Sequence, residues 1–538
     1  MKFNINALAV LVFSAYIVSG CSVPNKPSAK VQQYDVVVYG GSCAGVTAAV
    51  QAKQMGKSVV LVNPYSFLGG MTSSGLSSAD LGNVAAVSGM SKDFFSTMGR
   101  VLGKSFSATF EPHVAEKAFN ALIADNNIPV MNNERLDLQN GVVMKSNRIV
   151  SFKTESGKLF AAKMFIDATY EGDLMAKAGV SYTVGREGNG KYNETLNGVQ
   201  YGDQQPLSRI ADNGRDDHFI EKVDPYVVPG NPSSGLLPWI NVVRAKNGDG
   251  DNKIQAYNYR LTLTDSAENM IPFTKPAGYK DIDHELLFRN FEAGDHRLPG
   301  RRVNLPNRKM DWNSFGAVGT DMAGADFDYP DADYATRQRI EKLHETYIRG
   351  HFWALANHPR VPDSIRKEMK KWGYPKDEFV RNGGFPYMIY IRQARRMLSD
   401  YVMTEKNCDL KDTVNDPVVL GSYAKDSHAV QYVLTDDGHV EREGVFLKRT
   451  ATPYGVSYRS IVPKSGECPN LIVPICLSAS HVAYGSIRME PVYMSLGQVS
   501  AIAACLAIDG NTTVQDLPYE KIREQVLKAG ITIEWPKK

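Results

Sequence analysis

One short stretch constrains this chain most: a β-strand, a glycine-rich turn, a small-residue helix and a second strand in direct succession. Residues 34–39 form a mostly apolar run, and residues 40–45 follow as Gly-Gly-Ser-Cys-Ala-Gly. Residues 46–55 are rich in alanine and end at Gly56, and residues 58–62 are apolar again. Two buried-strand patterns around a helical stretch predict a β-α-β unit of a parallel sheet.

The turn of this unit has the chemistry of a dinucleotide site. Gly40 permits a tight turn, and Gly45 lets the helix pack closely on the strand. Pyrophosphate then lies at the helix N-terminus, where backbone N–H groups and the helix dipole favour an anion. Ser42 stands where a second glycine is usual, and its hydroxyl can donate to phosphate. A tight turn without a ligand is the alternative. The predicted cofactor contacts are Gly40, Gly41, Ser42, Cys43, Ala44 and Gly45.

The end of the second strand departs from the usual dinucleotide pattern. Asn63 occupies the position where an Asp or Glu normally holds the ribose hydroxyls. An amide can still hydrogen-bond a hydroxyl, although it has no charge. Asn63 is therefore predicted to contact the ribose.

Two further segments resemble FAD-dependent oxidoreductases. Residues 64–76 contain a Gly-Gly-Met turn that in those proteins passes close to the cofactor, where only glycine lets the backbone approach. Residues 164–174 resemble the strand that returns the chain to the cofactor domain through Asp-Ala-Thr-Gly, with Tyr170 in place of the glycine. The resemblance implies cofactor contacts from Gly69, Gly70, Met71, Ala168, Gly172 and Asp173.

The C-terminal part resembles the end of glutathione-reductase-class flavoproteins. Residues 476–491 precede an alanine-rich run, and in that class a glycine-started helix directs its N-terminal dipole at the flavin. This implies cofactor contacts from Gly497 and Gln498. Together the segments resemble a bacterial FAD-dependent oxidoreductase family, some of whose members are labelled xanthan lyase. The resemblance covers nearly the whole mature chain and implies FAD as the cofactor.

The expected fold class is α/β. A Rossmann-type FAD-binding domain, with three layers around a parallel sheet, carries an inserted α+β substrate domain. A length of 538 residues favours two or three packed domains. We place the FAD-binding domain in residues 33–185 and 451–538, and the substrate or cap domain with its helical region in residues 186–450.

Local patterns give expectations inside the cap domain. Residues 236–244 and 254–264 resemble paired strands joined by a turn-rich segment. Helical patterns run over residues 335–356, 363–372 and 391–403. In the last of these, Arg395 and Arg396 are expected either to face an anionic substrate or to line a solvated helix surface.

The catalytic candidates lie in the segment that should pass the flavin. The flavin supplies hydride chemistry, so the protein must position a substrate and manage a proton. His481 is the candidate acid or base, because an unperturbed imidazole titrates near neutral pH. A hydrogen bond to a flavin carbonyl, or packing in the core, is the alternative role. Tyr484 and Arg488 are candidates to bind substrate oxygens, and Glu490 is expected to pair with Arg488.

The N-terminal residues indicate export. Lys2 and an apolar stretch over residues 7–18 precede Val-Ser-Gly-Cys, which resembles a bacterial lipobox. The resemblance implies lipid on Cys21 and a membrane anchor, with residues 22–32 as a tether; an ordinary signal peptide is the alternative. No acidic run follows Cys21, so we expect the periplasmic face of the outer membrane.

Charge and cysteine usage exclude some partners. The net charge is +3 and there is no run of Lys and Arg, so no nucleic-acid partner is expected. Neither cysteines nor histidines have metal-ligand spacing, so no metal is expected. A disulfide between Cys408 and Cys468 is one possibility in an oxidising compartment.

The sequence thus predicts an FAD-dependent oxidoreductase. It would transfer a hydride between flavin and a small substrate, with a sugar-derived compound as a candidate, outside the cytoplasm. We find no second glycine-rich strand-turn-helix for NAD(P)H, so the electron partner is expected to be a quinone, a small carrier, oxygen or the substrate. Two alternatives are a polysaccharide lyase-type elimination enzyme and a non-catalytic FAD-containing binding lipoprotein.

Overall fold

The computed structural model describes residues 32–201 and 218–536. The predicted signal segment, Cys21 and residues 22–31 of the predicted tether lie outside this range. Residue 32, the last of that tether, already belongs to the first strand.

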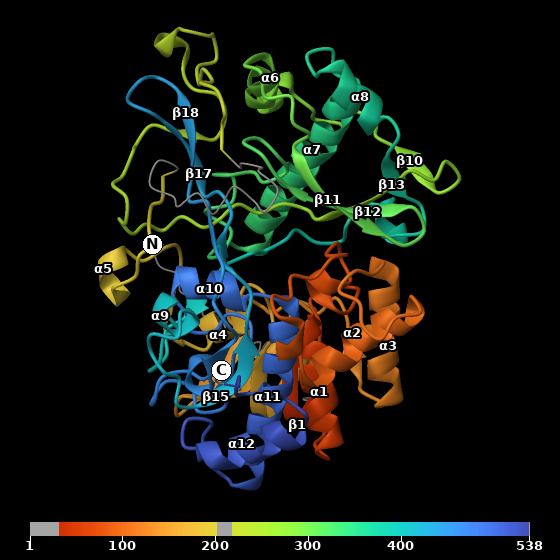
Figure 1. Ribbon diagram of the computed structural model, residues 1–538. Helices are drawn as coiled ribbons and strands as arrows, with labels where there is room; N and C mark the ends of the chain where they lie inside the picture. The colour runs from red at the N-terminus through yellow and green to blue at the C-terminus, as the bar shows by residue number, and fades with distance from the viewer. Residues whose placement is uncertain (1–31, 202–217, 537–538) are drawn as a thin grey trace, which may run out of the picture.

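A largely parallel sheet lies in the lower half of the molecule in Figure 1. β1 (Gln32–Tyr39) pairs in parallel with β2 (Val59–Val62) on one side and with β6 (Leu159–Asp167) on the other. β3 (Val130–Met131) extends the sheet beyond β2, and β21 (Leu471–Ile472) pairs in parallel with the end of β6. An antiparallel pair completes this sheet beside the start of β6, formed by β4 (Val142–Lys145) and β5 (Arg148–Lys153). This sheet confirms the predicted Rossmann-type core.

Two helices from opposite ends of the chain pack together on this sheet. α1 (Cys43–Gln54) follows the glycine turn, and α11 (Glu490–Asp509) lies directly against it. A Cβ at Gly497 would come 2.1 Å from the Ala44 carbonyl oxygen, so this contact requires glycine. Among the described residues, α11 alone is long and apolar enough to cross a membrane, but 89% of its apolar window is buried in the protein. It is therefore a core helix.

A second, antiparallel sheet lies above the first in Figure 1. Its strand order is β10-β13-β9-β12-β11, and the long helix α7 packs beside α8. The bounds are β9 Leu261–Thr264, β10 Met270–Pro272, β11 Gly300–Leu305, β12 Lys309–Ser314, β13 Gly373–Pro375, α6 Glu285–Glu292, α7 Tyr334–Asn357 and α8 Asp363–Met369. This region gives the chain the mixed α/β content that we expected.

Short elements connect the two regions. β15 (Pro417–Gly421) precedes residue 450 and pairs with β20 (Tyr454–Ser457), which follows it, so the two predicted domains share strand pairing there. The paired strands are β7 (Tyr182–Thr183) with β14 (Arg396–Met397), β15 (Pro417–Gly421) with β20 (Tyr454–Ser457), β16 (Lys425–Ser427) with β19 (Phe446–Lys448), and β17 (Gln431–Leu434) with β18 (Val440–Glu443) and β8 (Ile240–Asn241). The remaining helices are α2 Gly89–Val101, α3 Pro112–Asp125, α4 Asp173–Lys177, α5 Asn189–Tyr192, α9 Glu405–Cys408, α10 His481–Ile487 and α12 Tyr519–Lys528.

Several local expectations are wrong. Residues 391–403 form no helix, because the chain here is extended and β14 pairs with β7. The two strand segments predicted to pair do not meet: β8 joins β17, and β9 joins β12 and β13. The helices predicted over residues 335–356 and 363–372 are confirmed as α7 and α8. Cys408 and Cys468 are buried free thiols, so the possible disulfide is absent from this structure.

Candidate active site

The glycine turn owes its shape to very close backbone contacts. Gly40 has a φ of +109°, and a Cβ there would come 2.6 Å from the Ala168 backbone. A Cβ at Gly45 would come 1.8 Å from the Gly40 carbonyl oxygen. Glycine is needed at both positions so that α1 can begin directly after β1 and pack beside β6.

The Ser42 side chain caps α1 from within this turn. Its hydroxyl accepts a hydrogen bond from the Gly45 N–H at 3.1 Å and donates to the Ala168 carbonyl at 2.7 Å. The hydroxyl hydrogen is therefore used inside the protein, and the predicted donation to phosphate does not fit this structure. Cys43 and Ala44 are buried in the first turn of α1, and the Cys43 thiol faces the Glu490 carbonyl at 3.6 Å.

Asn63 does not fit its predicted ribose role either. Its side chain is fully buried, and its oxygen accepts hydrogen bonds from Gly41 N–H and Tyr65 N–H, each at 3.2 Å. Its nitrogen donates to the Phe67 carbonyl at 2.8 Å and to Asn132 at 2.9 Å. An amide offers both donors and acceptors, so Asn63 joins the loops around the turn and has no free position left for a ribose.

A cavity of about 250 Å³ lies at the carboxyl ends of β1 and β2. A narrower pocket lined by Gly40, Gly41 and Ser42 shares four of the cavity's lining residues, so the two adjoin. Five tyrosine rings, two guanidinium groups and three carboxyl groups surround the larger cavity, and the rings suit the adenine of a dinucleotide. The lining is Tyr39, Pro64, Tyr65, Arg135, Thr169, Glu171, Asp173, Tyr329, Tyr334, Arg337, Gln338, Glu341 and Tyr387.

Asp173 joins the two regions of the protein beside this cavity. Its carboxylate accepts two hydrogen bonds from Arg337 of α7, at 2.6 and 2.8 Å, and one from Arg395 at 2.7 Å. Burial raises the pKa of Asp173, but the two arginines outweigh this effect and lower it. Arg395 is thus part of a buried ion pair. Gly172, with φ +69°, caps α4 in a left-handed conformation.

The Gly69-Gly70 turn leads into a buried hydrogen-bond network that ends at the carboxyl group of Glu490. The Met71 N–H donates to the Tyr170 hydroxyl at 3.0 Å, and that hydroxyl donates to Glu490 at 2.8 Å. Burial raises the pKa of Glu490, which begins α11. The expected pairing of Glu490 with Arg488 is wrong, because Arg488 pairs with Asp426 at 2.8 Å.

The C-terminal helix does not begin at a glycine. α11 starts at Glu490, so Gly497 lies within the helix and faces α1. Gln498 donates to the Gln51 side chain at 2.9 Å and accepts from the Met90 N–H at 3.1 Å. Both residues pack helices together, and the structure does not support the predicted cofactor contacts for them.

His481 has one engaged ring nitrogen and one without a partner. Its Nδ1 lies 2.8 Å from the Gln393 side-chain oxygen, and its Nε2 is buried without a hydrogen-bond partner. The Gln393 nitrogen donates to the Gly185 carbonyl at 3.1 Å, which can only accept. The Gln393 oxygen therefore faces His481 and takes the hydrogen of Nδ1, so Nε2 carries the lone pair.

The surroundings keep this imidazole neutral. Burial lowers the pKa of His481 well below its ordinary value, and the nearby guanidinium groups of Arg186 and Arg396 lower it further. Arg396 is fully buried and pairs with Glu187 at 2.7 Å, so neither alternative proposed for this arginine from the sequence applies. A neutral imidazole with a free lone pair can accept a hydrogen bond from a substrate hydroxyl, and its lowered pKa makes it a weak base.

A hydrogen-bond chain joins His481 to Arg488. Gln255 donates to the Gln393 oxygen at 3.2 Å and accepts from Arg488 at 3.3 Å. Tyr484 lies in the same helix as His481, and its hydroxyl accepts a hydrogen bond from Tyr493 at 2.8 Å. Gln255 and Gln393 were not predicted as site residues, because a glutamine amide alone does not indicate a chemical role.

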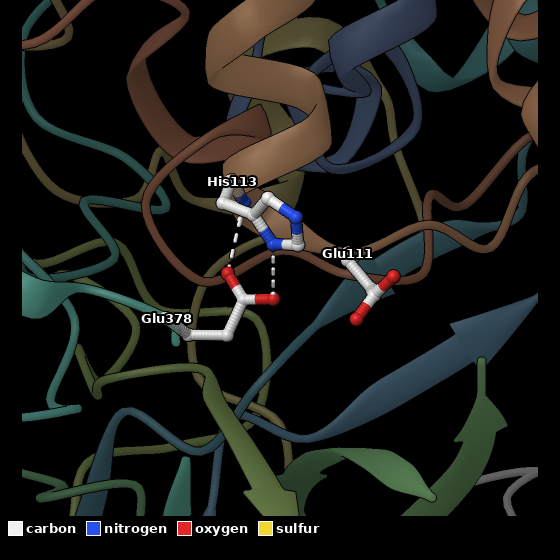
Figure 2. Close-up of side chains that lie close together, drawn as sticks. All are labelled: Glu111, His113 and Glu378. Atoms are coloured by element: carbon white, nitrogen blue, oxygen red, sulfur yellow. Dashed lines mark hydrogen bonds and ion pairs between the residues drawn. The ribbon is translucent and has the colours of Figure 1, made fainter. Parts of the chain in front are cut away.

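Figure 2 shows a separate cluster of Glu111, His113 and Glu378, whose ligand atoms lie within 4.8 Å of one another. His113 Nδ1 lies 2.7 Å from Glu378. The Lys309 ammonium is fully buried and contacts Glu111 at 2.6 Å and Glu378 at 2.7 Å. A positive charge of the protein itself therefore already lies among these carboxylates, and we assign no metal to them.

Comparisons with known proteins extend this description. The model of a family described as FAD dependent oxidoreductase matches residues 35–526. No curated protein matched the sequence. Among solved structures, the flavin-containing monooxygenase of Stenotrophomonas maltophilia aligns at 21% identity over 29% of this chain and 42% of its own, with a TM-score of 0.21.

Two reductases align over similar lengths. Thioredoxin reductase of T. acidophilum shows 18% identity over 25% of this chain and 34% of its own, with a TM-score of 0.18. Bacillithiol disulfide reductase of Staphylococcus aureus shows 13% identity over 29% and 43%, with a TM-score of 0.19. The chain thus spans less than half of each of these solved structures. Because the family model covers nearly its whole length, the chain belongs to the FAD-dependent oxidoreductase family and uses FAD as its cofactor.

Proposed function

We propose that this enzyme transfers a hydride between its flavin and an alcohol or carbonyl group of a small, sugar-derived substrate, with His481 handling the proton. The observation that carries this proposal is the buried, unpartnered Nε2 of His481, whose lone pair is fixed by the Gln393–Gly185 hydrogen bond. In alcohol oxidation the C–H hydride and the O–H proton both leave the substrate. FAD would supply the hydride acceptor when bound, and His481 Nε2 would take the hydroxyl proton.

The adenosine and phosphate half of FAD is assigned to the glycine turn and the adjoining cavity. The turn and cavity adjoin through shared lining residues, including Tyr65 and Glu171. Arg135 and Arg337 of the cavity lining are already paired with Glu155 and Asp173 of the protein, so the pyrophosphate is assigned to the glycine turn and the N-terminus of α1. We therefore assign the ribose contacts to side chains of the cavity instead of Asn63.

The test is an anaerobic reduction experiment. The purified protein is loaded with FAD, and the flavin absorbance is followed while sugars, sugar alcohols and sugar acids are added. Bleaching by one compound class supports the proposal. A flavin that dithionite reduces but no compound in the panel does would overturn the sugar-derived substrate.

The role of His481 needs a matched pair of variants. His481→Gln should lower the bleaching rate about 100-fold or more, the usual contribution of a positioned base. His351→Gln alters another fully buried histidine, in α7, and should leave the rate unchanged. Equal rates in the two variants would remove His481 from the mechanism.

We also propose that the chain is exported and held at the membrane by lipid on Cys21. The lipobox-like segment before Cys21 supports this. In cells, Cys21→Ser should move the protein from the membrane fraction to the soluble fraction. Unchanged membrane association would contradict a lipid anchor at this cysteine.

A further inference from the structure

The first turns of α7 connect two regions of the protein: the cap region, formed by α7 and the antiparallel sheet, and the cofactor region, formed by the parallel sheet and the glycine turn. The Tyr334 hydroxyl donates to the Leu136 carbonyl, in the segment after β3, at 3.0 Å. In the next turn of the helix, Arg337 pairs with Asp173 at 2.6 Å. In Figure 1, α7 runs from the upper part of the molecule down towards the lower part. The cap region therefore reaches the cofactor region through the N-terminal end of this helix.

This end of α7 forms one side of the cavity beside the glycine turn. The lining residues that the cavity shares with the glycine-turn pocket all belong to the cofactor region: Pro64, Tyr65, Thr169 and Glu171. α7 and the loop before it supply the opposite group: Tyr329, Tyr334, Arg337, Gln338 and Glu341. With the pyrophosphate at the glycine turn, the shared residues lie nearest to it. Adenine is the terminal group of FAD, so the α7 side is where its base belongs.

Glu341 has an unused acceptor on this side of the cavity. The Tyr329 hydroxyl donates to its Oε1 at 2.9 Å, which orients the carboxyl group. In the described part of the chain, no group donates a hydrogen bond to its Oε2. The carboxylate of Asp173, by contrast, already accepts three hydrogen bonds from Arg337 and Arg395. Glu341 can therefore accept a hydrogen bond from a ligand in the cavity.

Gln338 places a donor close to this acceptor. Gln338 and Glu341 are three residues apart in α7, so their side chains lie on the same face of the helix, and both line the cavity. A glutamine amide both donates and accepts, whereas a carboxylate only accepts. The adenine edge has the matching pattern, because its N6 amino group donates and the neighbouring ring nitrogens accept. A base with a carbonyl oxygen at position 6 would instead bring an acceptor against the carboxylate.

We propose that Glu341 and Gln338 of α7 bind the adenine base of FAD, with Glu341 accepting a hydrogen bond from the N6 amino group and Gln338 donating to a ring nitrogen. This inference rests on the assignment of the adenosine half of FAD to this cavity under the proposed function. It does not depend on the substrate or on His481. Because α7 belongs to the cap region, FAD then joins the cap region to the cofactor region.

The first test uses the unaltered full-length protein. Binding of FAD is compared with binding of its deaminated analogue, in which hypoxanthine replaces adenine, by quenching of the flavin fluorescence. The titrations are made at pH 8, because burial raises the pKa of Glu341 and alkaline solution favours its carboxylate. We expect the analogue to bind about tenfold more weakly, because a carboxylate cannot donate to its O6.

The other outcomes separate this inference from the proposed function. Equal affinities for FAD and the analogue would overturn the recognition of adenine by Glu341, while bleaching of the bound flavin by a sugar would leave the proposed function intact. If neither compound binds, the assignment of FAD to this cavity fails, and the inference fails with it.

A matched pair of variants on α7 tests the residue. Glu341→Gln keeps the size of the side chain and an oxygen for Tyr329, but it presents an amide donor to the base. It should weaken FAD binding about tenfold and bring the affinities for FAD and the analogue together, because the amide can donate to O6. Glu345→Gln alters the next turn of the helix, where Glu345 pairs with Lys342 at 2.9 Å and Arg349 at 2.8 Å and does not line the cavity. It should leave both affinities unchanged.

The affinity ratio decides the role of Glu341. A ratio in Glu341→Gln equal to that of the unaltered protein would remove this residue from base recognition. Melting curves check the folding of both variants. If Glu341→Gln does not fold, the comparison of FAD with its analogue on the unaltered protein still decides.

Hydrogen exchange tests the link between the two regions. FAD should slow amide exchange in residues 334–345 of α7, and it should do so less in Glu341→Gln. Exchange in α12, which does not line the cavity, should stay the same and serves as the internal control. Equal exchange of α7 with and without FAD would show that the base does not contact this helix.

Discussion

The imidazole of His481 and the amide of Gln393 are joined by one hydrogen bond of 2.8 Å, and the Gly185 carbonyl fixes which way the amide points. Gln393→Leu removes this orientation, so we expect turnover to fall about tenfold or more with little change in FAD content. The double variant Gln393→Leu/His481→Gln should turn over only slightly more slowly than His481→Gln alone, because both residues act on the same proton transfer. Additive losses, measured by anaerobic stopped-flow, would show that Gln393 acts elsewhere.

The glycine turn should tolerate no side chain at Gly45. Alanine there would place its Cβ 1.8 Å from the Gly40 carbonyl oxygen, and the backbone would have to move. We expect Gly45→Ala to cost about 3 kcal/mol or more in urea unfolding and to lower FAD content. Gly190→Ala is the control, because Gly190 lies in exposed helix α5 with no atom within 4 Å of the added Cβ. Similar stability of the two variants would contradict the close contact.

Asp173 should be important for stability. Asp173→Asn leaves the buried guanidinium groups of Arg337 and Arg395 without a charged partner, which we expect to cost about 3 kcal/mol in denaturant unfolding. Asp509→Asn breaks a pair with Lys57 in which the carboxylate is 60% exposed, and it should cost less than about 1 kcal/mol. A small effect at Asp173 would mean that the two arginines find other partners.

FAD affinity should depend on the ionisation of Glu171. Burial raises the pKa of Glu171, the Arg337 guanidinium lowers it, and the Asp173 carboxylate raises it. The net effect is a raised pKa. Glu171 is therefore protonated in acid and becomes negative as the pH rises through this raised pKa, and it then repels the pyrophosphate. We expect FAD to bind more weakly at about pH 9 than at about pH 6, by fluorescence titration. Glu171→Gln should flatten this dependence, and an unchanged slope would place the pyrophosphate away from Glu171.

Chelators should not affect the cluster in Figure 2, because the Lys309 ammonium already lies among its carboxylates. EDTA should leave the melting temperature unchanged. Lys309→Met leaves Glu111 and Glu378 without their cation and should cost about 3 kcal/mol or more. A melting temperature that falls in EDTA would instead indicate a bound metal.

The sequence predicted those parts of the fold that local signals determine. Two apolar runs around a glycine turn predict the β1-α1-β2 unit. The contacts of these glycines are close in sequence or come from the adjoining strand. α7 and α8 also have helical periodicity of their own. Residues 391–403 have the same periodicity, but strand pairing of β14 with β7 and buried ion pairs of Arg395 and Arg396 outweigh it.

The candidate site was predicted only in part. His481 and Arg488 were found because they lie in a recognisable C-terminal segment. Gln255 and Gln393 come from distant positions, and their amide side chains alone indicate no chemical role. Asn63 was assigned from its position after β2, but its contacts to Gly41 and Asn132 exist only after the loops fold around it. Such roles depend on which groups meet in space.

The central sheet has a consequence for the synthesis of the chain. β21 pairs with β6 and α11 packs on α1, although about 300 residues separate the two strands along the chain and about 440 separate the two helices. At the usual rate of about 5–20 residues per second, the first strands of the sheet must wait on the order of 15–60 s for their last partners. During that interval the apolar edge of β6 and the face of α1 have no native cover. Folding intermediates of this enzyme should therefore depend on chaperones, and truncation before β21 should yield aggregates rather than an independent cofactor domain.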